Sequence, residues 1–266
     1  SVEGYVEVMM DYDWGDEQRD AFFVDSGLSY YGLEADITGA TRANPVEITA
    51  AAHGFGNGDR VKLFGVYGMT ELNLMEAIVA NKTDDTFELA GVDGRAFTAY
   101  VSGGTVQRMA TKVSGLAHLE GRTVDVLTDG AAHPARVVSA GEISLEWPAC
   151  VAHVGLPYTS TVETTGLEGG SREGSSQGKQ KRVHEVCLRF HRTLGGKVGP
   201  DEDHLDTIGF RTARDTYGNP PVLYTGDKDI PFADDWTGES TVMVVQDQPL
   251  PMTVLSIMPR FRSEDR

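Results

Sequence analysis

The sequence predicts an all-β protein, with a main domain of β-sandwich or barrel type and a second, small β-barrel inserted into it. Glycine occupies 31 of the 266 positions, well above a typical level of about 7%, and this abundance indicates many tight turns between short strands. Short segments alternate apolar and polar residues, which is the period of a half-buried strand. No long segment shows the 3.6-residue apolar period of an amphipathic helix.

Composition excludes several classes of protein. The formal net charge is −17, which argues against general binding to nucleic acid or to an anionic membrane. Cys150 and Cys187 are too few for a disulfide scaffold, and we expect both to be small buried residues rather than a bridge. No stretch approaches the roughly 20 apolar residues of a membrane span. Because the chain starts at Ser1 without a methionine, we expect trimming or an excerpt of a longer polypeptide.

The first two predicted parts are an N-terminal set of strands and the inserted barrel. Residues 1–41 are predicted to hold strands that join the main domain, including one at 21–24 that ends in a turn at 25–27. Residues 42–109 are predicted to form the small barrel, with one helical turn at 69–73. Its expected strands are 46–49, 60–64, 77–80, 86–89 and 104–108.

Residues 110–266 are predicted to form the main β domain. It should begin as a meander whose strands are 124–127, 136–138 and 142–145, separated by turns at 128–130 and 140–141.

Further along, the glycine-rich stretch 166–178 is predicted to be a mobile loop. The strand 183–190 should carry one dry and one wet face. The last two strands, 241–245 and 252–258, are expected to form a hairpin closed by the proline-containing turn 246–251.

The sequence offers only weak candidates for a metal-binding or catalytic site. The positions of His184 and His191 differ by an odd number, which places the two side chains on opposite faces of a strand. The acidic segment 201–204 lacks the glycine of a calcium-binding EF-hand loop, so a solvated loop is the better interpretation. Carboxylate pairs such as Asp234 with Asp235, or Asp11 with Asp13, leave a glycosidase open.

No nucleophile elbow, phosphate-binding glycine loop or dinucleotide-binding unit is present in the sequence. We therefore predict a protein that is not an enzyme, with no catalytic residue, cofactor or metal.

The segment from Pro45 to Arg108 resembles the first catalytic cysteine half-domain of ubiquitin-activating enzymes, a small β-barrel that also occurs as a module in phage proteins. The residues that carry the resemblance are Ala52–Val61, Gly65–Asn73 and Thr86–Gly94. The segment contains no cysteine, so the resemblance implies a structural module and no ubiquitin chemistry.

The chain from Gly115 to its end resembles the C-terminal part of the tail nozzle proteins of short-tailed bacteriophages, also called tail tubular proteins B or stabilisation proteins. The resemblance is carried in order by Gly115–Val124, Asp129–Pro134, Val151–Tyr158, Gly178–Arg182, Arg192–Lys197, Leu223–Asp227 and Asp247–Leu255. Val24–Leu28 also resembles the family. In that family the matching segment directly precedes the sequence that corresponds to the segment starting here at Gly115. Proteins of this family are usually several times longer.

The second resemblance implies a structural tail component that forms part of the channel for DNA ejection. The chain would form a ring, expected to be a hexamer, and would contact adaptor and fibre proteins. DNA would pass through the ring without sequence-specific binding. The protein would be assembled in the bacterial host cytoplasm and reside in the virion tail. The alternative is a receptor-binding or glycan-degrading tail protein.

Ring subunits meet through two different surface patches, and the sequence offers one basic and one acidic candidate. The candidate subunit-interface residues are Lys179, Lys181, Arg182, Arg189 and Arg192 on the basic side and Asp201, Glu202 and Asp203 on the acidic side.

Overall fold

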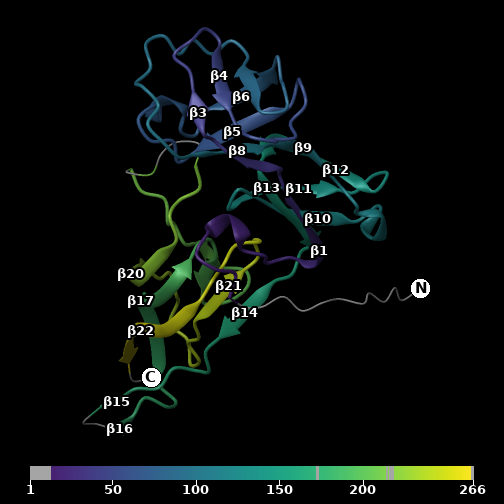
Figure 1. Cartoon of the computed structure of the whole chain (residues 1–266). Helices are drawn as coiled ribbons and strands as arrows, with labels where there is room; N and C mark the ends of the chain where they lie inside the picture. Colours follow the sequence, from purple (N-terminus) through teal and green to yellow (C-terminus); the bar gives the residue numbers. More distant parts are fainter. Residues whose placement is uncertain (1–12, 172–173, 214, 216–218, 265–266) are drawn as a thin grey trace. The chain divides into compact units, whose positions relative to one another are not determined.

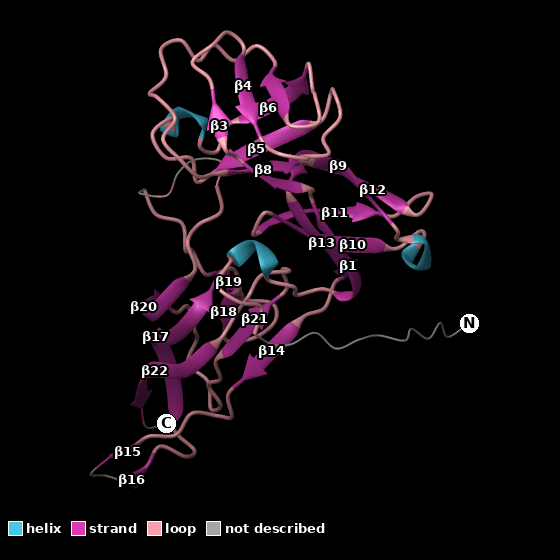
Figure 2. Ribbon diagram, viewed as in Figure 1, coloured by secondary structure: helices cyan, strands magenta, loops and turns pink. Residues whose placement is uncertain are grey.

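The computed structural model describes residues 13–171, 174–213, 215 and 219–264. Strands make up 48% of the chain and helices 4%, so the prediction of an all-β protein is confirmed (Figure 2). None of the helices in the described part of the chain has the length and apolar character that a membrane span requires.

The chain forms two compact units. Unit 1 contains the described residues up to Gly27, Val124–His133 and the chain from Gly155 onward. Unit 2 contains Leu28–Thr123 and Pro134–Val154.

Unit 2 contains a seven-stranded antiparallel sheet whose order is β2-β8-β5-β6-β7-β4-β3. Figure 1 labels β3, β4, β5, β6 and β8 of this sheet. The five strands predicted for the small barrel are present to within one residue. The one predicted helical turn is η2 (Thr70–Leu72). The strands are β2 (Glu34–Asp36), β3 (Gly39–Ala40), β4 (Val46–Thr49), β5 (Arg60–Phe64), β6 (Glu76–Ala80), β7 (Thr86–Leu89) and β8 (Thr105–Arg108).

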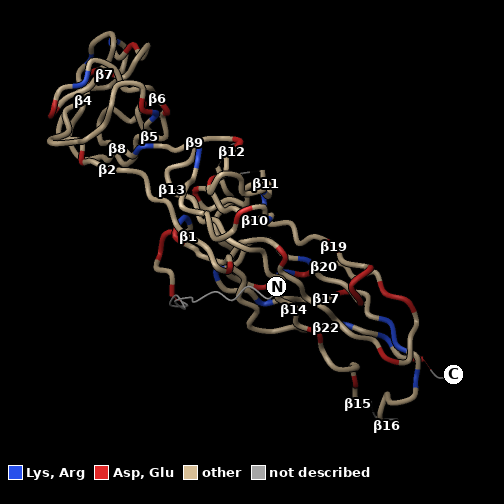
Figure 3. Tube along the Cα trace, turned by 90° about the vertical axis from the view of Figure 1, so that its right-hand side faces the viewer, with Lys and Arg blue, Asp and Glu red and all other residues tan. Residues whose placement is uncertain are grey.

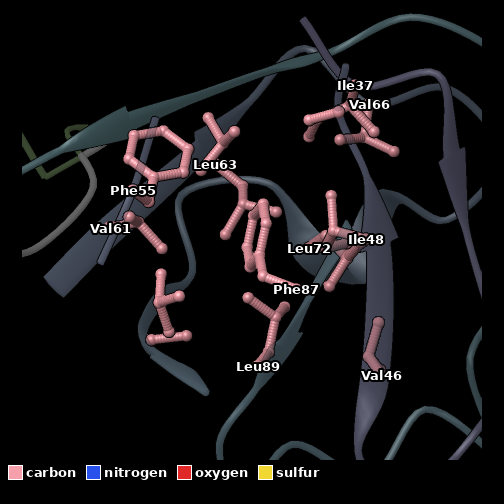
Figure 4. Packing of buried hydrophobic residues seen from close by; sticks show 14 of the residues in the cluster. Ile37, Val46, Ile48, Phe55, Val61, Leu63, Val66, Leu72, Phe87 and Leu89 are labelled. Carbon is pink, nitrogen blue, oxygen red and sulfur yellow. The ribbon is translucent and has the colours of Figure 1, made fainter. Parts of the chain in front are cut away.

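The core of this small barrel follows directly from the alternation in its strands. Val46 and Ile48, Val61 and Leu63, and Phe87 and Leu89 are all buried, because successive side chains of a strand point to opposite faces. Their side chains converge in one cluster (Figure 4).

The barrel leaves and rejoins the chain at one narrow neck. The backbone N–H of Arg108 donates to the Leu33 carbonyl at 2.8 Å, and the N–H of Gly32 donates to the Cys150 carbonyl at 2.7 Å. The Gln107 side-chain amide also donates to the carbonyl of Gly32 at 3.2 Å. The two ends of the inserted segment therefore lie side by side, as an insertion at one point requires.

Strand β1 (Asp25–Tyr31) begins where a turn was predicted. The prediction of a strand at 21–24 is wrong. Ala21 and Phe23 instead pack from an irregular segment into an apolar cluster with Leu127, Leu194 and Leu250. Strand β1 belongs to a sheet of the order β1-β13-β10-β11, formed with β10 (Thr123–Thr128), β11 (Ala131–Val137) and β13 (Val151–Leu156). Asp129 and Gly130, which join β10 to β11, have φ values of 48° and 84°, as a tight type I′ hairpin needs.

The predicted meander is wrong after β11. Strand β12 (Glu142–Ala149) pairs with β9 (Ala110–Ser114) instead of β11. The Glu120 carboxylate accepts the N–H groups of Ala140 and Gly141 at 2.9 and 2.7 Å. These bonds, next to η3 (Ala117–Leu119), hold the turn against the segment that follows β9 and direct β12 to that strand.

Two sheets of unit 1 share one core. The first has the order β20-β17-β22 and the second β14-β21-β18-β19. Val186, Leu188 and Phe190 of the first sheet pack in a cluster with Val198 and Val244 of the second. The strands are β14 (Ser160–Glu163), β17 (Gln180–Thr193), β18 (Lys197–Gly199), β19 (Asp206–Thr207), β20 (Tyr224–Pro231), β21 (Met243–Gln246) and β22 (Val254–Glu264), and η1 (Gln18–Asp20) precedes them.

The prediction of a hairpin at the end of the chain is wrong. Strands β21 and β22 belong to different sheets, because the segment between them crosses from one sheet to the other. The Gln246 side-chain amide donates to the Leu194 carbonyl at 2.9 Å, and Thr253 accepts the His191 N–H at 3.0 Å. These bonds bring the chain beside β17, where β22 then pairs.

The glycine-rich stretch that was predicted to be a loop contains two very short paired strands, β15 (Gly170–Ser171) and β16 (Gly174–Ser175). The Gly169 N–H donates to the Ser176 hydroxyl at 2.8 Å, and the Ser176 N–H donates to the Gly169 carbonyl at 3.1 Å. Residues 172–173 of the predicted loop lie outside the described residues.

Candidate assembly surface

The three-stranded sheet β20-β17-β22 has one apolar and one charged face, as was predicted for its central strand. Lys181 and Val183 point to the buried face, and then a β-bulge shifts the register between Val183 and Glu185. The bulge adds one residue to β17, so that Val186, Leu188 and Phe190 continue the buried face. Glu185, Cys187 and Arg189 therefore share the outer face with Arg182.

Arginines and carboxylates on neighbouring strands pair across this outer face. Figure 3 colours the charged positions along the trace of these strands. The Arg189 guanidinium binds the Asp227 carboxylate through two bonds of 2.6 and 2.8 Å. Arg260 lies 2.8 Å from the Glu185 carboxylate and 3.8 Å from that of Asp229. The three strands are thus joined by charged side chains as well as by their backbones.

The pKa values of several side chains on this face are shifted by those ion pairs and by burial. The hydrogen bonds from Arg189 lower the pKa of Asp227, and Asp227 raises the pKa of Arg189 in return. Burial raises the pKa of the Cys187 thiol, and a hydrogen bond to Asp229 raises it further. Cys187 and Cys150 are both buried and are not joined by a disulfide bond, as predicted.

Arg182 and Arg262 stand apart from these pairs. They are direct cross-strand partners in the β17–β22 ladder, and both side chains are exposed. The Arg182 Nε donates to the main-chain carbonyl of Asp234 at 2.9 Å. Among the residues that the structure describes, no carboxylate lies within salt-bridge distance of either guanidinium. We call Arg182 and Arg262 the arginine pair.

Of the other predicted basic residues, Arg189 shares the outer face with this pair, whereas Lys181 and Arg192 make other contacts. Lys181 is only 4% exposed, and its ammonium lies 3.4 Å from the Gly238 carbonyl. Because successive side chains of a strand point to opposite faces, Lys181 lies on the buried face of β17 while Arg182 lies on the outer face. The Lys179 N–H donates to the Ser176 carbonyl at 3.3 Å. The Arg192 guanidinium lies 4.0 Å from the centre of the Trp14 ring and donates to the Gly15 carbonyl.

The predicted acidic side lies in the exposed loop between β18 and β19. Asp201 accepts a hydrogen bond from His204 at 2.7 Å, which lowers the pKa of Asp201 and raises that of His204. Glu202 and Asp203 have exposed side chains, and no cation in the described ranges lies within salt-bridge distance of their carboxylates. We call Glu202 and Asp203 the acidic pair.

Sequence reasoning missed the residues of β20 and β22 that complete the charged face. Asp227, Asp229, Arg260 and Arg262 lie far from β17 in the sequence. The alternation of Arg260 and Arg262 with Phe261 was the signal that could have found the basic part of the face.

Other predicted chemistry finds little geometry to support it. In residues 13–171, 174–213, 215 and 219–264, no three His, Cys, Asp or Glu side chains gather into a group that could hold a metal ion. Asp234 accepts the Val183 N–H at 3.0 Å and therefore serves the fold. A hollow of about 520 Å³ beside β11 and β12 has Glu142 as its single acidic residue, whereas glycoside hydrolysis needs two carboxylates. Asp11 lies outside the described residues.

Comparison with known proteins identifies the inserted module. Residues 46–110 match the family model of the FCCH domain of the ubiquitin-activating enzyme E1, which confirms the resemblance of the small barrel. The match covers about a quarter of the chain, and it contains neither cysteine. No curated protein matches the chain.

Proposed function

We propose that this chain is a structural subunit of a ring in the tail of a short-tailed bacteriophage, of the nozzle type, and that the ring forms part of the channel for DNA ejection. The proposal rests on the resemblance of Val24–Leu28 and of the chain from Gly115 onward to that family. The module at 46–110 is then a decoration on the ring subunit.

One contact carries the proposal. In nozzle proteins, the segment that resembles Val24–Leu28 directly precedes the segment that resembles the chain from Gly115. In this chain, the small barrel is inserted between these two segments. In the structure, a Cβ placed on Gly115 would lie 3.3 Å from Cδ2 of Leu28. The end of Val24–Leu28 and the start of the segment at Gly115 are therefore neighbours in space. This supports one nozzle-like β domain that is interrupted by an inserted module.

Charge and architecture are compatible with this role. Duplex DNA carries about one charge per 1.7 Å of its axis, so a channel wall with excess carboxylates repels DNA and prevents adhesion during ejection. The net charge of −17 supplies that excess. The two sheets of unit 1 share one core, which suits a stiff wall.

The partners and location follow from the same proposal. The ring would contact itself, an adaptor above it and tail fibres, and DNA would pass without sequence-specific binding. The chain would be assembled in the bacterial cytoplasm and remain in the virion tail.

The mass of the purified protein in solution and its image in negative stain test the proposal. We expect rings of about six copies with a central hole, and no retardation of duplex DNA at physiological salt. A monomer over the whole concentration range would contradict the ring. A compact trimer would instead favour the receptor-binding or glycan-degrading alternative.

A further inference from the structure

Within the described part of the chain, the arginine pair has no carboxylate partner. Like charges directly opposite each other destabilise an antiparallel strand pair, and Arg182 and Arg262 occupy such positions. The other two arginines that line this face, Arg189 and Arg260, each have a carboxylate partner. Acidic residues outnumber basic ones by 40 to 23, yet these two arginines have no carboxylate partner among the described residues. A partner molecule that carries carboxylates would neutralise them.

The acidic pair has no cationic partner among the described residues. Glu202 and Asp203 project from the β18–β19 loop, while Asp201 in the same loop is held by His204. Strand β18 contributes Val198 to the core that covers the buried face of β17, whereas Arg182 lies on the other face of β17. No ion pair joins the two pairs within the described residues of one copy.

We propose that the arginine pair of one copy binds the acidic pair of a second copy of this chain. The inference deepens the proposed ring and rests on it. Two different patches that complement each other produce a head-to-tail contact, and such contacts generate rings when the rotation closes. Arginine is suited to this role because its planar guanidinium donates two parallel hydrogen bonds to a carboxylate.

A second copy fits the arginine pair better than a nucleic acid does. Phosphates also accept bidentate bonds from arginine, but a duplex would bring repulsion from the whole acidic chain along its length. A second copy presents the acidic pair in a loop that paired strands hold. DNA binding through the same arginines is therefore an outcome that the test must detect.

Complementary charge reversal provides the test on the full chain. Variant A carries Arg182→Glu and Arg262→Glu, so both patches are acidic; variant B carries Glu202→Lys and Asp203→Lys, so both are basic. A mixture of A and B has complementary charges at every contact of an alternating ring with an even number of copies. Lys82→Glu with Arg122→Glu is the matched control, because both residues are exposed and the net charge changes by the same amount as in A.

Sedimentation velocity at low and high salt is the measurement. We expect wild type and the control to form rings, A and B alone to self-associate at least tenfold more weakly, and the equimolar mixture to recover rings. Salt should weaken the wild-type ring, because exposed charge pairs are screened. Circular dichroism of A and B must match wild type, so that loss of association does not reflect unfolding.

The failures are distinguishable. If wild type forms rings and A and B form them equally well, this contact is overturned while the proposed function stands. If wild type forms no ring at all, both the contact between copies and the proposed function are contradicted. If A assembles normally but loses binding to duplex DNA that wild type shows, the arginine pair binds phosphate and the contact between copies is overturned.

Discussion

Gly32 lies so close to Arg108 that a Cβ added to Gly32 would be 1.8 Å from the Arg108 carbonyl oxygen. The same Cβ would lie 3.1 Å from the Cys150 carbonyl oxygen. Three backbone segments therefore meet at the neck of the inserted barrel, and only a residue without a side chain fits between them.

Replacing Gly32 by alanine should destabilise the protein. The added methyl group meets backbone rather than a flexible side chain, so the neck must shift, and overpacking of this kind costs about 1–3 kcal/mol. Denaturant unfolding would measure the loss. Gly209→Ala is the control, since a Cβ there meets no atom within 4 Å, and equal stability of the two variants would contradict the close approach at the neck.

The inserted barrel should be removable. Glu34 and Gln107 are cross-strand partners at the neck, so replacing residues 35–106 by Asn-Gly would close them with a two-residue hairpin turn. We expect the shortened chain to remain folded and to form the same oligomer as wild type, with a smaller denaturant m-value because less surface is exposed on unfolding. Insolubility of the shortened chain would show that the module supports the main domain.

The strands of the small barrel could be predicted because their alternation is regular and local. Val46 and Ile48, or Val61 and Leu63, define a buried face without knowledge of any partner strand. Pairing could not be read in the same way. Strand β12 joins β9 through hydrogen bonds from a turn to Glu120, and alternation specifies the face of a strand but not its neighbour.

The candidate surface was predicted only in part for a similar reason. Arg182 was found from a run of basic residues, but Lys181 in the same run is buried because side chains alternate along β17. Arg262 joins Arg182 only through the register of β17 with β22. That register includes a bulge, whose position depends on tertiary packing and leaves no clear sequence signal.

His53 should contribute strongly to the stability of the small barrel. Its Nδ1 accepts the Phe55 N–H at 3.0 Å, and its ring lies 5.2 and 5.0 Å from the rings of Phe55 and Phe87. His53→Ala would leave a cavity and an unpaired N–H, so we expect a loss of about 2–4 kcal/mol. Thermal and denaturant unfolding would measure it, and the exposed His184→Ala should change stability by less than about 0.5 kcal/mol. Similar losses for both variants would argue against a packed role for His53.

The pair formed by His204 and Asp201 predicts a titration that differs from that of a free histidine. The hydrogen bond from His204 to Asp201 raises the pKa of His204 above its ordinary value of 6.5 and lowers that of Asp201 below 3.8. Its stabilising effect on the β18–β19 loop is therefore fully present between about pH 3.8 and 6.5. It is lost as the pH rises through the raised pKa of His204, or falls through the lowered pKa of Asp201.

An NMR titration of the His204 ring would measure this effect. Asp201→Asn should return the pKa of His204 toward 6.5, because the largest cause of its rise is removed. Asp235→Asn is the matched control: Asp235 is the smallest of the causes that raise the same pKa, so its change should be the smaller of the two. If both variants shift His204 equally, long-range charge rather than the hydrogen bond sets its protonation, and the loop that presents Glu202 and Asp203 is not held by this pair.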